Sequence, residues 1–486
     1  MSRCRVVQRS MKLVFWIAIL MATSAAAVAQ RGTLGARTPS SNRMGSRSAG
    51  GRNFADPKIA SALSKISAAN IRDTVTRLAE FHTRQTLSAA DPDSIAKGRG
   101  IGAAREWIKS EFERYSRECG GCLEVHTDAF VQPKSERVPA PTEIVNVYAV
   151  LRGSDPGNAK RIYLVTGHYD SRNSGAEDVT GEAPGANDDA SGTAVSLECA
   201  RVLSQHRFPA TIIFLAVAGE EQGLYGSEHF AKMAKQEGWQ IEAVLNNDIV
   251  GGDRSPGQDP HRVRLFSEGV PVTAAEAGAP DDVRRIRALG AENDSASREL
   301  ARYVADIASV YLPSSFQPML VFRPDRFLRG GDHLSFNQEG FAAVRFTEYR
   351  ENYNHQHQDV RTEKGIEYGD LPKFVDFDYV ANVARLNAAS LAALASAPAP
   401  PAEVRLLAKE LENSSTLLWQ PSPGGLADSY EVLWRATTAP LWEHSKSVGS
   451  ATRVTLEESK DNVIFAVRAV DVAGHRSLPV TPTPEH

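Results

Sequence analysis

The stretch ATIIFLAVAGEEQGLYG, residues 210–226, joins an apolar strand pattern to two adjacent acidic residues. It begins with a continuous apolar run rich in β-branched residues, which is typical of a strand buried on both faces of a sheet. The run ends at a glycine, and Glu220 and Glu221 follow directly. Two adjacent like charges at the end of a buried strand are unfavourable unless a cation lies close to them. This stretch therefore predicts a strand that delivers carboxylates to a site.

The segments on either side alternate between strand and helix patterns. In chain order the main ones are the strands IVNVYAVL (144–151) and RIYLVTGH (161–168), the helix ASGTAVSLECARVLSQH (190–206), the helix GSEHFAKMAKQEG (226–238), the strand IEAVLNNDIVG (241–251), the helix DSASRELARYVADIASVYL (294–312), the strand FAAVRFTE (341–348) and a long helix near 373–395. This alternation predicts an α/β fold with a mostly parallel sheet that helices cover on both faces.

Residues 1–29 have the pattern of a secretory signal peptide. A basic start precedes the apolar centre LVFWIAIL, and AVAQ offers a small-x-small cleavage site after Ala29. An uncleaved anchor is the alternative, but the apolar run is short for a membrane span. Cleavage removes four basic residues and changes the formal net charge from −4 to −8, which gives no indication of nucleic-acid binding. The expected mature protein is secreted or periplasmic and does not span a membrane.

Composition divides the remaining chain into four parts. Residues 30–55 are rich in Gly, Ser and Arg and predict a flexible leader. Residues 56–396 carry the α/β pattern, and residues 397–403 form a Pro/Ala linker. Residues 404–486 contain only short strand patterns, which predict a small β-sandwich.

The order of residues in this sandwich resembles a fibronectin type III domain. Trp419 lies early and VRAVDVAGHRS (467–477) lies late, although Val463 occupies the place of the usual tyrosine. Such a domain would bind or position something: an unknown partner, a polymer or the α/β domain itself.

Two closely spaced cysteines could close a small disulfide loop in an exported protein. Cys119 and Cys122 form a CGGC motif that precedes a strand pattern, whereas a redox C-x-x-C motif opens a helix after a strand. A structural disulfide is therefore favoured over a redox or metal-binding pair. Cys199 lies in an apolar helix pattern and is expected to be a buried thiol.

Acidic and imidazole groups follow three of the predicted strands and one predicted loop. They are His168 and Asp170 after the strand at 161–168, Asp188 and Asp189 before the helix at 190, Glu220 and Glu221, and Asp248. In open α/β sheets, ligands bind at the carboxyl ends of the strands. Each group alone has an ordinary explanation, such as a helix N-cap for an Asp. Together they predict a metal centre, because mixed Asp, Glu and His ligands suit zinc and a shared carboxylate can join two ions.

Five ordered motifs carry a resemblance to a known family. GHYDS (167–171), GANDDASG (185–192), AGEEQGLYGS (218–227), LNNDIVG (245–251) and NYNHQHQD (352–359) resemble the motifs of metallopeptidase family 28. The resemblance covers about residues 60–395 and implies a zinc-exopeptidase fold with two Zn²⁺ ions. It implies that His168 and Asp248 hold one ion, that Glu221 and a C-terminal histidine hold the other, and that Asp188 bridges them. Glu220 would be the general base, and Asp170 would orient the imidazole of His168.

Two histidines near the C-terminal end of the α/β pattern could be the ligand of the second ion. The family pattern favours His355, because Asp359 follows it four residues later, and His357 is its competitor. Asn354 stands where the family commonly has a tyrosine. Nearby, Asp332 and His333 in GGDHLSF (330–336) would either shape the pocket or form a structural turn.

The expected function is that of a secreted two-zinc aminopeptidase acting on peptide or protein substrates. A metallo-carboxypeptidase or dipeptidase is the first alternative, and Arg323, Arg326 and Arg329 offer a basic group for a substrate carboxylate. A non-catalytic binding protein that retains the fold is the second. Glutaminyl cyclase activity is a further alternative, but two complete zinc sites favour hydrolysis over it.

Overall fold

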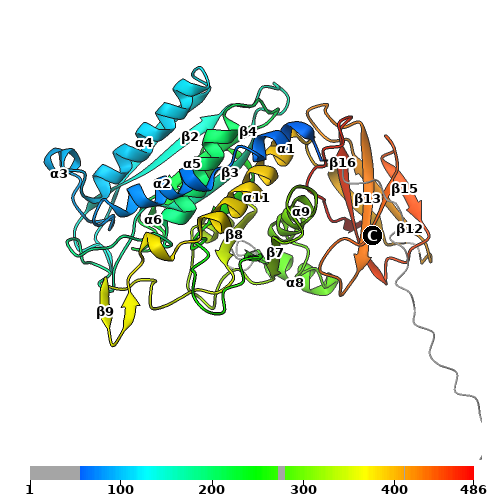
Figure 1. The fold of residues 1–486 in the computed structure, drawn as a ribbon. Helices are drawn as coiled ribbons and strands as arrows, with labels where there is room; N and C mark the ends of the chain where they lie inside the picture. Colours follow the sequence, from blue (N-terminus) through cyan, green and yellow to red (C-terminus); the bar gives the residue numbers. More distant parts are fainter. Residues whose placement is uncertain (1–54, 272–279, 410, 486) are drawn as a thin grey trace, which may run out of the picture. The chain divides into compact units, whose positions relative to one another are not determined.

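The computed structural model describes residues 55–271, 280–409 and 411–485. The predicted signal peptide, and all of the predicted leader except its last residue, lie outside these ranges. Within them, no helix combines the length and the apolar character that crossing a bilayer requires. An eight-stranded sheet forms the centre of the α/β domain, and a separate pair of smaller sheets follows it in the chain (Figure 1).

The middle of the large sheet is parallel. Its neighbouring strands are β4 (Thr211–Val217), β3 (Arg161–His168), β5 (Gln240–Asn247) and β8 (Ala343–Glu348). All residues of β4 are buried, as expected for a strand with helices over both faces. The predicted α/β fold class is therefore confirmed.

Antiparallel pairs flank the parallel middle of the sheet on both sides. β1 (Leu123–Gln132) and β2 (Thr142–Leu151) form a hairpin that continues onto β4, because the connection between them is too short for a parallel crossover. On the other side, β6 (Arg262–Ser267) pairs antiparallel with β8, and β7 (Gln317–Val321) pairs parallel with β6.

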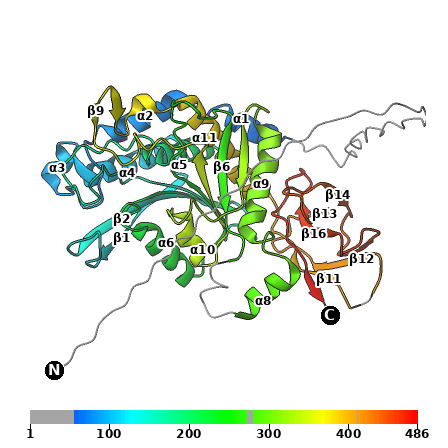
Figure 2. The ribbon, with the colours of Figure 1, turned by 90° about the horizontal axis from the view of Figure 1, so that it is seen from below.

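Helices cover both faces of the sheet, as Figure 2 shows. One face is covered by α2 (Ala68–Ala79), α4 (Gly100–Glu118), α5 (Ala190–Leu203), α9 (Ala296–Tyr311) and α11 (Phe377–Ser396), and the other by α6 (Tyr225–Gln236) and α10 (His333–Gln338). Separate apolar cores fill the space on the two faces. The smaller elements are α1 (Pro57–Leu63), α3 (Pro92–Ala96), α8 (Pro280–Leu289), β9 (Arg361–Glu363), β10 (Ile366–Tyr368) and η1 (Pro372–Phe374).

The start of α5 packs tightly against the ends of β3 and β5. A Cβ at Gly192 would lie 2.1 Å from the backbone oxygen of Asn247, and one at Gly167 would lie 2.3 Å from the backbone of Gly192. Only glycine permits this approach, since real Cβ atoms do not come so near. The N-cap of α5 is Asp189, whose carboxylate accepts a hydrogen bond from Gly192 N at 2.9 Å. The residue before this cap, Asp188, is thereby held at the carboxyl end of the sheet.

Both sequence predictions about cysteines agree with the structure. Cys119 and Cys122 form a disulfide at the end of α4, and Cys199 is a buried free thiol in α5. Ser204 O lies 3.1 Å from Cys122 Sγ, so the small disulfide loop also contacts the end of α5.

The C-terminal residues form two facing sheets with an apolar core between them. One sheet contains β11 (Ala402–Leu407), β12 (Ser415–Gln420), β15 (Arg453–Leu456) and β17 (Thr483–Glu485), and the other contains β13 (Ser429–Ala436), β14 (His444–Ser447) and β16 (Val463–Val470). Trp419 and Tyr430 pack edge to face in this core. The resemblance to a fibronectin type III domain stays a prediction.

Buried charges join this sandwich to α9. Arg435 in β13 pairs with Asp294, and Arg302 Nε donates to Pro440 O at 2.8 Å. Trp442 Nε1 donates to Glu299 at 3.0 Å, and Arg302 Nη1 contacts the other oxygen of Glu299 at 2.6 Å. Burial raises the pKa of Glu299 to about 7, although Arg302 opposes the change. A contact built from so many buried polar groups favours one fixed packing arrangement.

A histidine of the sandwich contacts the N-terminal end of α1. His475 lies 2.8 Å from Asp471 and 3.0 Å from Asp56, the N-cap of α1. The hydrogen bond to Asp471 raises the pKa of His475, although burial opposes it. The imidazolium therefore adds stability below the unfolded-state pKa near 6.5, and this stability is lost as pH rises through the higher folded-state value.

We expect His475→Gln to lower the free energy of unfolding by about 1.5 kcal/mol at pH 6 and by less at pH 9. Urea unfolding followed at both pH values measures this difference. His444→Gln, in β14 of the same sandwich, is the matched control. An equal loss at both pH values would show that the charge of His475 does not contribute.

Candidate metal centre

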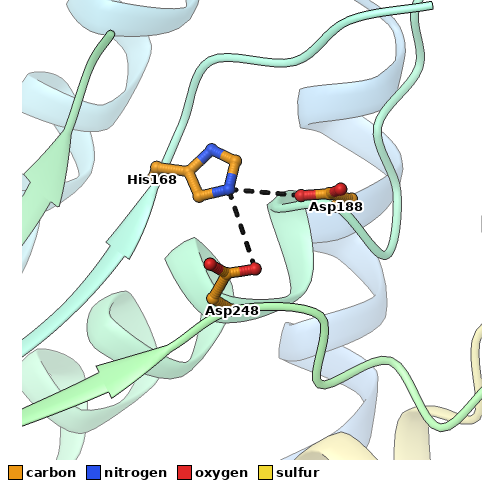
Figure 3. Close-up of side chains that lie close together, drawn as sticks. All are labelled: His168, Asp188 and Asp248. Atoms are coloured by element: carbon orange, nitrogen blue, oxygen red, sulfur yellow. Dashed lines mark ion pairs between the residues drawn. The ribbon is translucent and has the colours of Figure 1, made fainter. Parts of the chain in front are cut away.

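The first group of ligand-type side chains lies at the end of β3. His168, Asp188 and Asp248 each offer a nitrogen or oxygen atom, and these atoms lie within 4.8 Å of one another. His168 Nε2 is 3.2 Å from Asp188 Oδ1 and 4.0 Å from Asp248 Oδ1. Figure 3 shows the ring nitrogen facing both carboxylates. All three side chains are buried, so water does not screen their charges.

Asp170 supports this group from the other side of the imidazole. Its carboxylate lies 3.4 Å from His168 Nδ1, and its backbone oxygen lies 3.1 Å from the same nitrogen. The carboxylate also accepts hydrogen bonds from Thr86 Oγ1 at 2.8 Å and from Glu221 N at 3.1 Å. Asp170 therefore contacts both the histidine and the turn that carries the two glutamates, as a residue that orients a ligand should.

The second group shares Asp188 with the first. It consists of Asp188, Glu221 and His357, whose ligand-type atoms also lie within 4.8 Å of one another. His357 Nε2 is 2.9 Å from Asp188 Oδ2 and 3.0 Å from Glu221 Oε1. The two oxygens of Asp188 thus face different histidines. Although burial lowers it, the carboxylates of Glu221 and Asp188 raise the pKa of His357 to about 10.

The structure does not bring His355, the histidine preferred from the sequence, into this group. Its ring stacks on Phe374 at 3.6 Å between centroids, and its Nδ1 contacts Asp253. The reason is a turn: the backbone nitrogens of His355 and Gln356 both donate to Asn352 O at 3.0 Å. This turn, followed by a positive φ of 53° at His357, directs the later histidine toward Glu221. In this structure His357, and not the expected His355, lies beside Asp188 and Glu221.

The two adjacent glutamates occupy different positions. Gly219, with a φ of 79°, ends the extended path of β4, and Glu221 is buried against His357. Glu220 is half-buried and lines the open cavity. Burial raises its pKa well above the usual range; His168 opposes this and Asp248 adds to it. Both glutamates line the cavity, and Glu220 is the more exposed carboxylate of the pair.

Arg345 is a site residue that the sequence did not reveal. It lies in β8, is fully buried, and its Nη2 is 2.8 Å from Asp248 Oδ1. A second nitrogen pairs with Asp325 at 3.3 Å. In the sequence Arg345 is one charge inside the apolar run AAVRF, which is a weak signal, because buried arginines are rare unless they are paired.

Asp370 holds the loop that carries Asp188, and the sequence did not reveal it either. Its two oxygens accept hydrogen bonds from Asn187 N at 2.8 Å and from Asp188 N at 2.7 Å. The fully buried Arg84 donates to the backbone oxygens of Pro184 and Gly185 in the same loop. Gln356 Nε2 donates to Asp188 Oδ2 at 3.1 Å. The shared carboxylate is thus fixed on both its backbone and its side chain.

The two groups border one cavity of about 490 Å³. Asp188, Glu220, Glu221, Asp248 and His357 line it together with several arginines. Asp332 and His333 do not line it: both are fully buried where α10 begins, and His333 Nε2 contacts Pro324 O at 2.6 Å. Of the two roles that the sequence left open for them, the structural one agrees with this position.

The donor set fits zinc. His168 Nε2 is buried and has no hydrogen-bond partner among the described residues, although it faces two carboxylates. Asp248 pairs with Arg345, whereas the ion-pair partners of Asp188 and Glu221 among the described residues are imidazoles, so bound cations would balance their charge. Nitrogen and carboxylate oxygen are the mixture that Zn²⁺ accepts. His168 and Asp248 would hold one ion, Glu221 and His357 a second, and Asp188 would contact both.

Comparisons with known proteins agree with the sequence motifs. Residues 146–376 match the model of Peptidase family M28. The chain is 46% identical over 432 residues to a probable zinc metalloprotease of Pyrenophora teres f. teres, with 88% of this chain and 87% of the relative covered. It is 45% identical over 442 residues to a probable zinc metalloprotease of Pyricularia oryzae, with 88% and 85% covered.

The fold also resembles a solved structure. LapA from Legionella pneumophila matches with a TM-score of 0.50 and 22% identity, over 71% of this chain and 78% of that chain. The family match lies within the α/β domain and includes every residue of the two ligand groups. The extent and identity of the relatives, together with the family match, lead to one conclusion: the chain belongs to peptidase family M28.

Proposed function

We propose that this protein is a zinc exopeptidase that binds two Zn²⁺ ions and removes residues from the N-terminus of peptides. One observation carries the proposal: two ligand groups share Asp188 at the carboxyl end of a parallel sheet, beside a cavity. Two-metal hydrolases hold their ions about 3.5–4 Å apart, which a shared carboxylate permits. The names of the curated relatives support zinc and proteolysis.

The roles of the chain's own residues follow from their positions. Bound zinc would supply a Lewis acid for the scissile carbonyl and lower the pKa of a bound water. Glu220, which lines the cavity, would accept a proton from the attacking water and return it to the nitrogen of the leaving amine. Asp170 would keep His168 in the orientation that presents Nε2 to the ion.

Cleavage next to a free C-terminus, as in a carboxypeptidase or dipeptidase, is the second candidate. The observation that favours it is a set of arginines in the cavity wall, Arg326 and Arg329 among them. A non-catalytic binding protein is less well supported, because both ligand groups and Glu220 are intact.

Export of the protein remains a proposal drawn from the sequence. The basic and apolar pattern of residues 1–29 supports a secreted or periplasmic protein. The disulfide between Cys119 and Cys122 is consistent with this, since disulfides persist in oxidising compartments.

Assays on blocked and free peptides test the proposal. We expect the zinc-loaded protein to cleave peptides with a free N-terminus and to leave N-acetylated peptides intact. A chelator should abolish cleavage and added zinc should restore it. Cleavage of N-acetylated peptides at a free C-terminus would favour the carboxypeptidase instead, and zinc binding without hydrolysis of either substrate would favour the binding protein.

A further inference from the structure

The connection between β13 and β14 docks on the first turns of α9. Pro440 O accepts a hydrogen bond from Arg302 Nε at 2.8 Å, and Trp442 Nε1 donates to Glu299 at 3.0 Å. Glu299 also pairs with Arg302 at 2.6 Å. The side chains of Arg302 and Glu299 are only 1% and 4% exposed, so water does not readily replace a lost partner. The sandwich therefore helps to fix the position of the Arg302 guanidinium.

The same guanidinium lies over Phe322, the residue that follows β7. Its Cζ is 5.3 Å from the centroid of the ring, and the Cζ of Arg298, one turn earlier in α9, is 4.5 Å from the same centroid. Both arginines are buried. A cation over the face of an aromatic ring is attracted to it, and the attraction is larger away from water. Two side chains of α9 therefore hold the ring of Phe322.

Arg298 also contacts the backbone partner of the next residue, Arg323. Arg298 Nε donates to Ser267 O at 3.1 Å, and Ser267 N donates to Arg323 O at 2.9 Å. Ser267 is the last residue of β6, the neighbour of β7 in the sheet. The chain that leaves β7 is thus anchored through a side chain and through its backbone, and α9 takes part in both contacts.

Residues 322–330, which we call the wall segment, border the cavity and have little apolar packing of their own. Those that line the cavity are Arg326, Leu328, Arg329 and Gly330. Phe327 and Leu328 are 80% and 102% exposed. A segment with few buried apolar contacts keeps one position only where other groups anchor it. One anchor is Asp325, which pairs with Arg345 at 3.3 Å, and another is the contact of Phe322 with α9.

We propose that the C-terminal sandwich is a positioning element for the cavity. Its β13–β14 connection fixes Glu299 and Arg302 of α9, and α9 in turn holds Phe322 and the wall segment. The partner of this face of the sandwich is therefore the α/β domain of the same chain. This inference goes beyond the proposed function and rests on it only for the effect on substrate binding. Trp442, Arg302 and Phe322 are positioning residues that act through the wall segment.

Amide hydrogen exchange of the wall segment tests this coupling in the full chain without any substrate. Trp442→Phe removes the N–H that Glu299 accepts but keeps an aromatic ring beside Arg435. We expect the backbone amides of residues 322–330 to exchange roughly 2- to 30-fold faster in this variant, the range that couplings through packed side chains reach. Phe322→Leu, which removes the ring but leaves the contacts of Trp442 in place, should give an increase of similar size.

Tyr303→Phe is the matched control for Trp442→Phe. Tyr303 Oη donates to Arg476 O of the sandwich at 3.1 Å, so this variant also loses one hydrogen bond between α9 and the sandwich. That hydrogen bond involves neither Glu299 nor Arg302, and exchange of the wall segment should stay at the unsubstituted rate. Thermal unfolding of each variant measures any general loss of stability.

Kinetics on a cleaved peptide give a second readout. Trp442→Phe and Phe322→Leu should raise KM several-fold and change kcat by less than about two-fold, because the wall segment contributes to binding and contains no zinc ligand. The zinc content of both variants should equal that of the unsubstituted protein. Tyr303→Phe should leave KM unchanged.

Two results would overturn the proposal. One is unchanged exchange of residues 322–330 in either Trp442→Phe or Phe322→Leu. The other is an equal increase in Tyr303→Phe, which would show a general loosening of the protein instead of a route through Arg302 and Phe322. Both are measured without hydrolysis, so failure of this coupling and failure of the proposed function are distinguishable.

Discussion

Glu220→Gln is expected to lower kcat by roughly 100- to 10,000-fold while the zinc content stays at the unsubstituted level. Glutamine has nearly the same size as glutamate, but its amide cannot accept and return a proton. Glu220 lines the cavity and is not a member of either ligand group, so its replacement leaves the metal ligands in place. Steady-state kinetics on a peptide with a free N-terminus, together with metal analysis of the same sample, measures both quantities.

Glu228→Gln is the matched control for this substitution. Glu228 lies in the first turn of α6, where it pairs with Lys232 at the surface. Its replacement should change kcat by less than about two-fold, because it touches neither ligand group. If Glu220→Gln keeps most of its activity, Glu220 is not the general base.

His357→Ala is the second substitution with a large expected effect. It removes the imidazole that lies 2.9 Å from Asp188 and 3.0 Å from Glu221. The second ion would then have only two carboxylate side chains from this group. We expect one of the two zinc ions to be lost on dialysis and kcat/KM to fall by roughly 100-fold or more.

His355→Ala distinguishes the two histidines. We expect this variant to retain both ions, because His355 contacts Phe374 and Asp253 and is outside the ligand groups. The substitution should instead lower the free energy of unfolding by about 1–3 kcal/mol, since one oxygen of the buried Asp253 loses its partner while the other keeps Ser255. Loss of zinc in His355→Ala, with retention in His357→Ala, would restore the assignment made from the family motif.

Much of the fold follows from the sequence because its central strands are buried on both faces. Such strands appear as continuous apolar runs, and β3, β4 and β5 are easily recognised. Since their carboxyl ends meet at one edge, the polar residues that follow each run were expected to converge. His168, Asp188, Glu221 and Asp248 do lie together, and this required no knowledge of side-chain contacts.

The remaining features depend on contacts that local sequence does not encode. Arg345 and Asp370 support the ligands from more than 90 residues away along the chain, and nothing in their neighbouring residues indicates a partner. The choice between His355 and His357 depends on the turn that begins at Asn352, and both histidines have similar sequence surroundings. The antiparallel pairs of the sheet likewise depend on long-range contacts, because β2 pairs with β4 and β6 pairs with β8.

The proposed function requires Asp188 to join two zinc sites. Diffraction from zinc-loaded crystals at the zinc absorption edge tests it most directly. We expect two anomalous peaks about 3.5–4 Å apart, on either side of the Asp188 carboxylate. One peak should lie beside His168 and Asp248, and the other beside Glu221 and His357. A single peak, or a second peak beside His355, would contradict it.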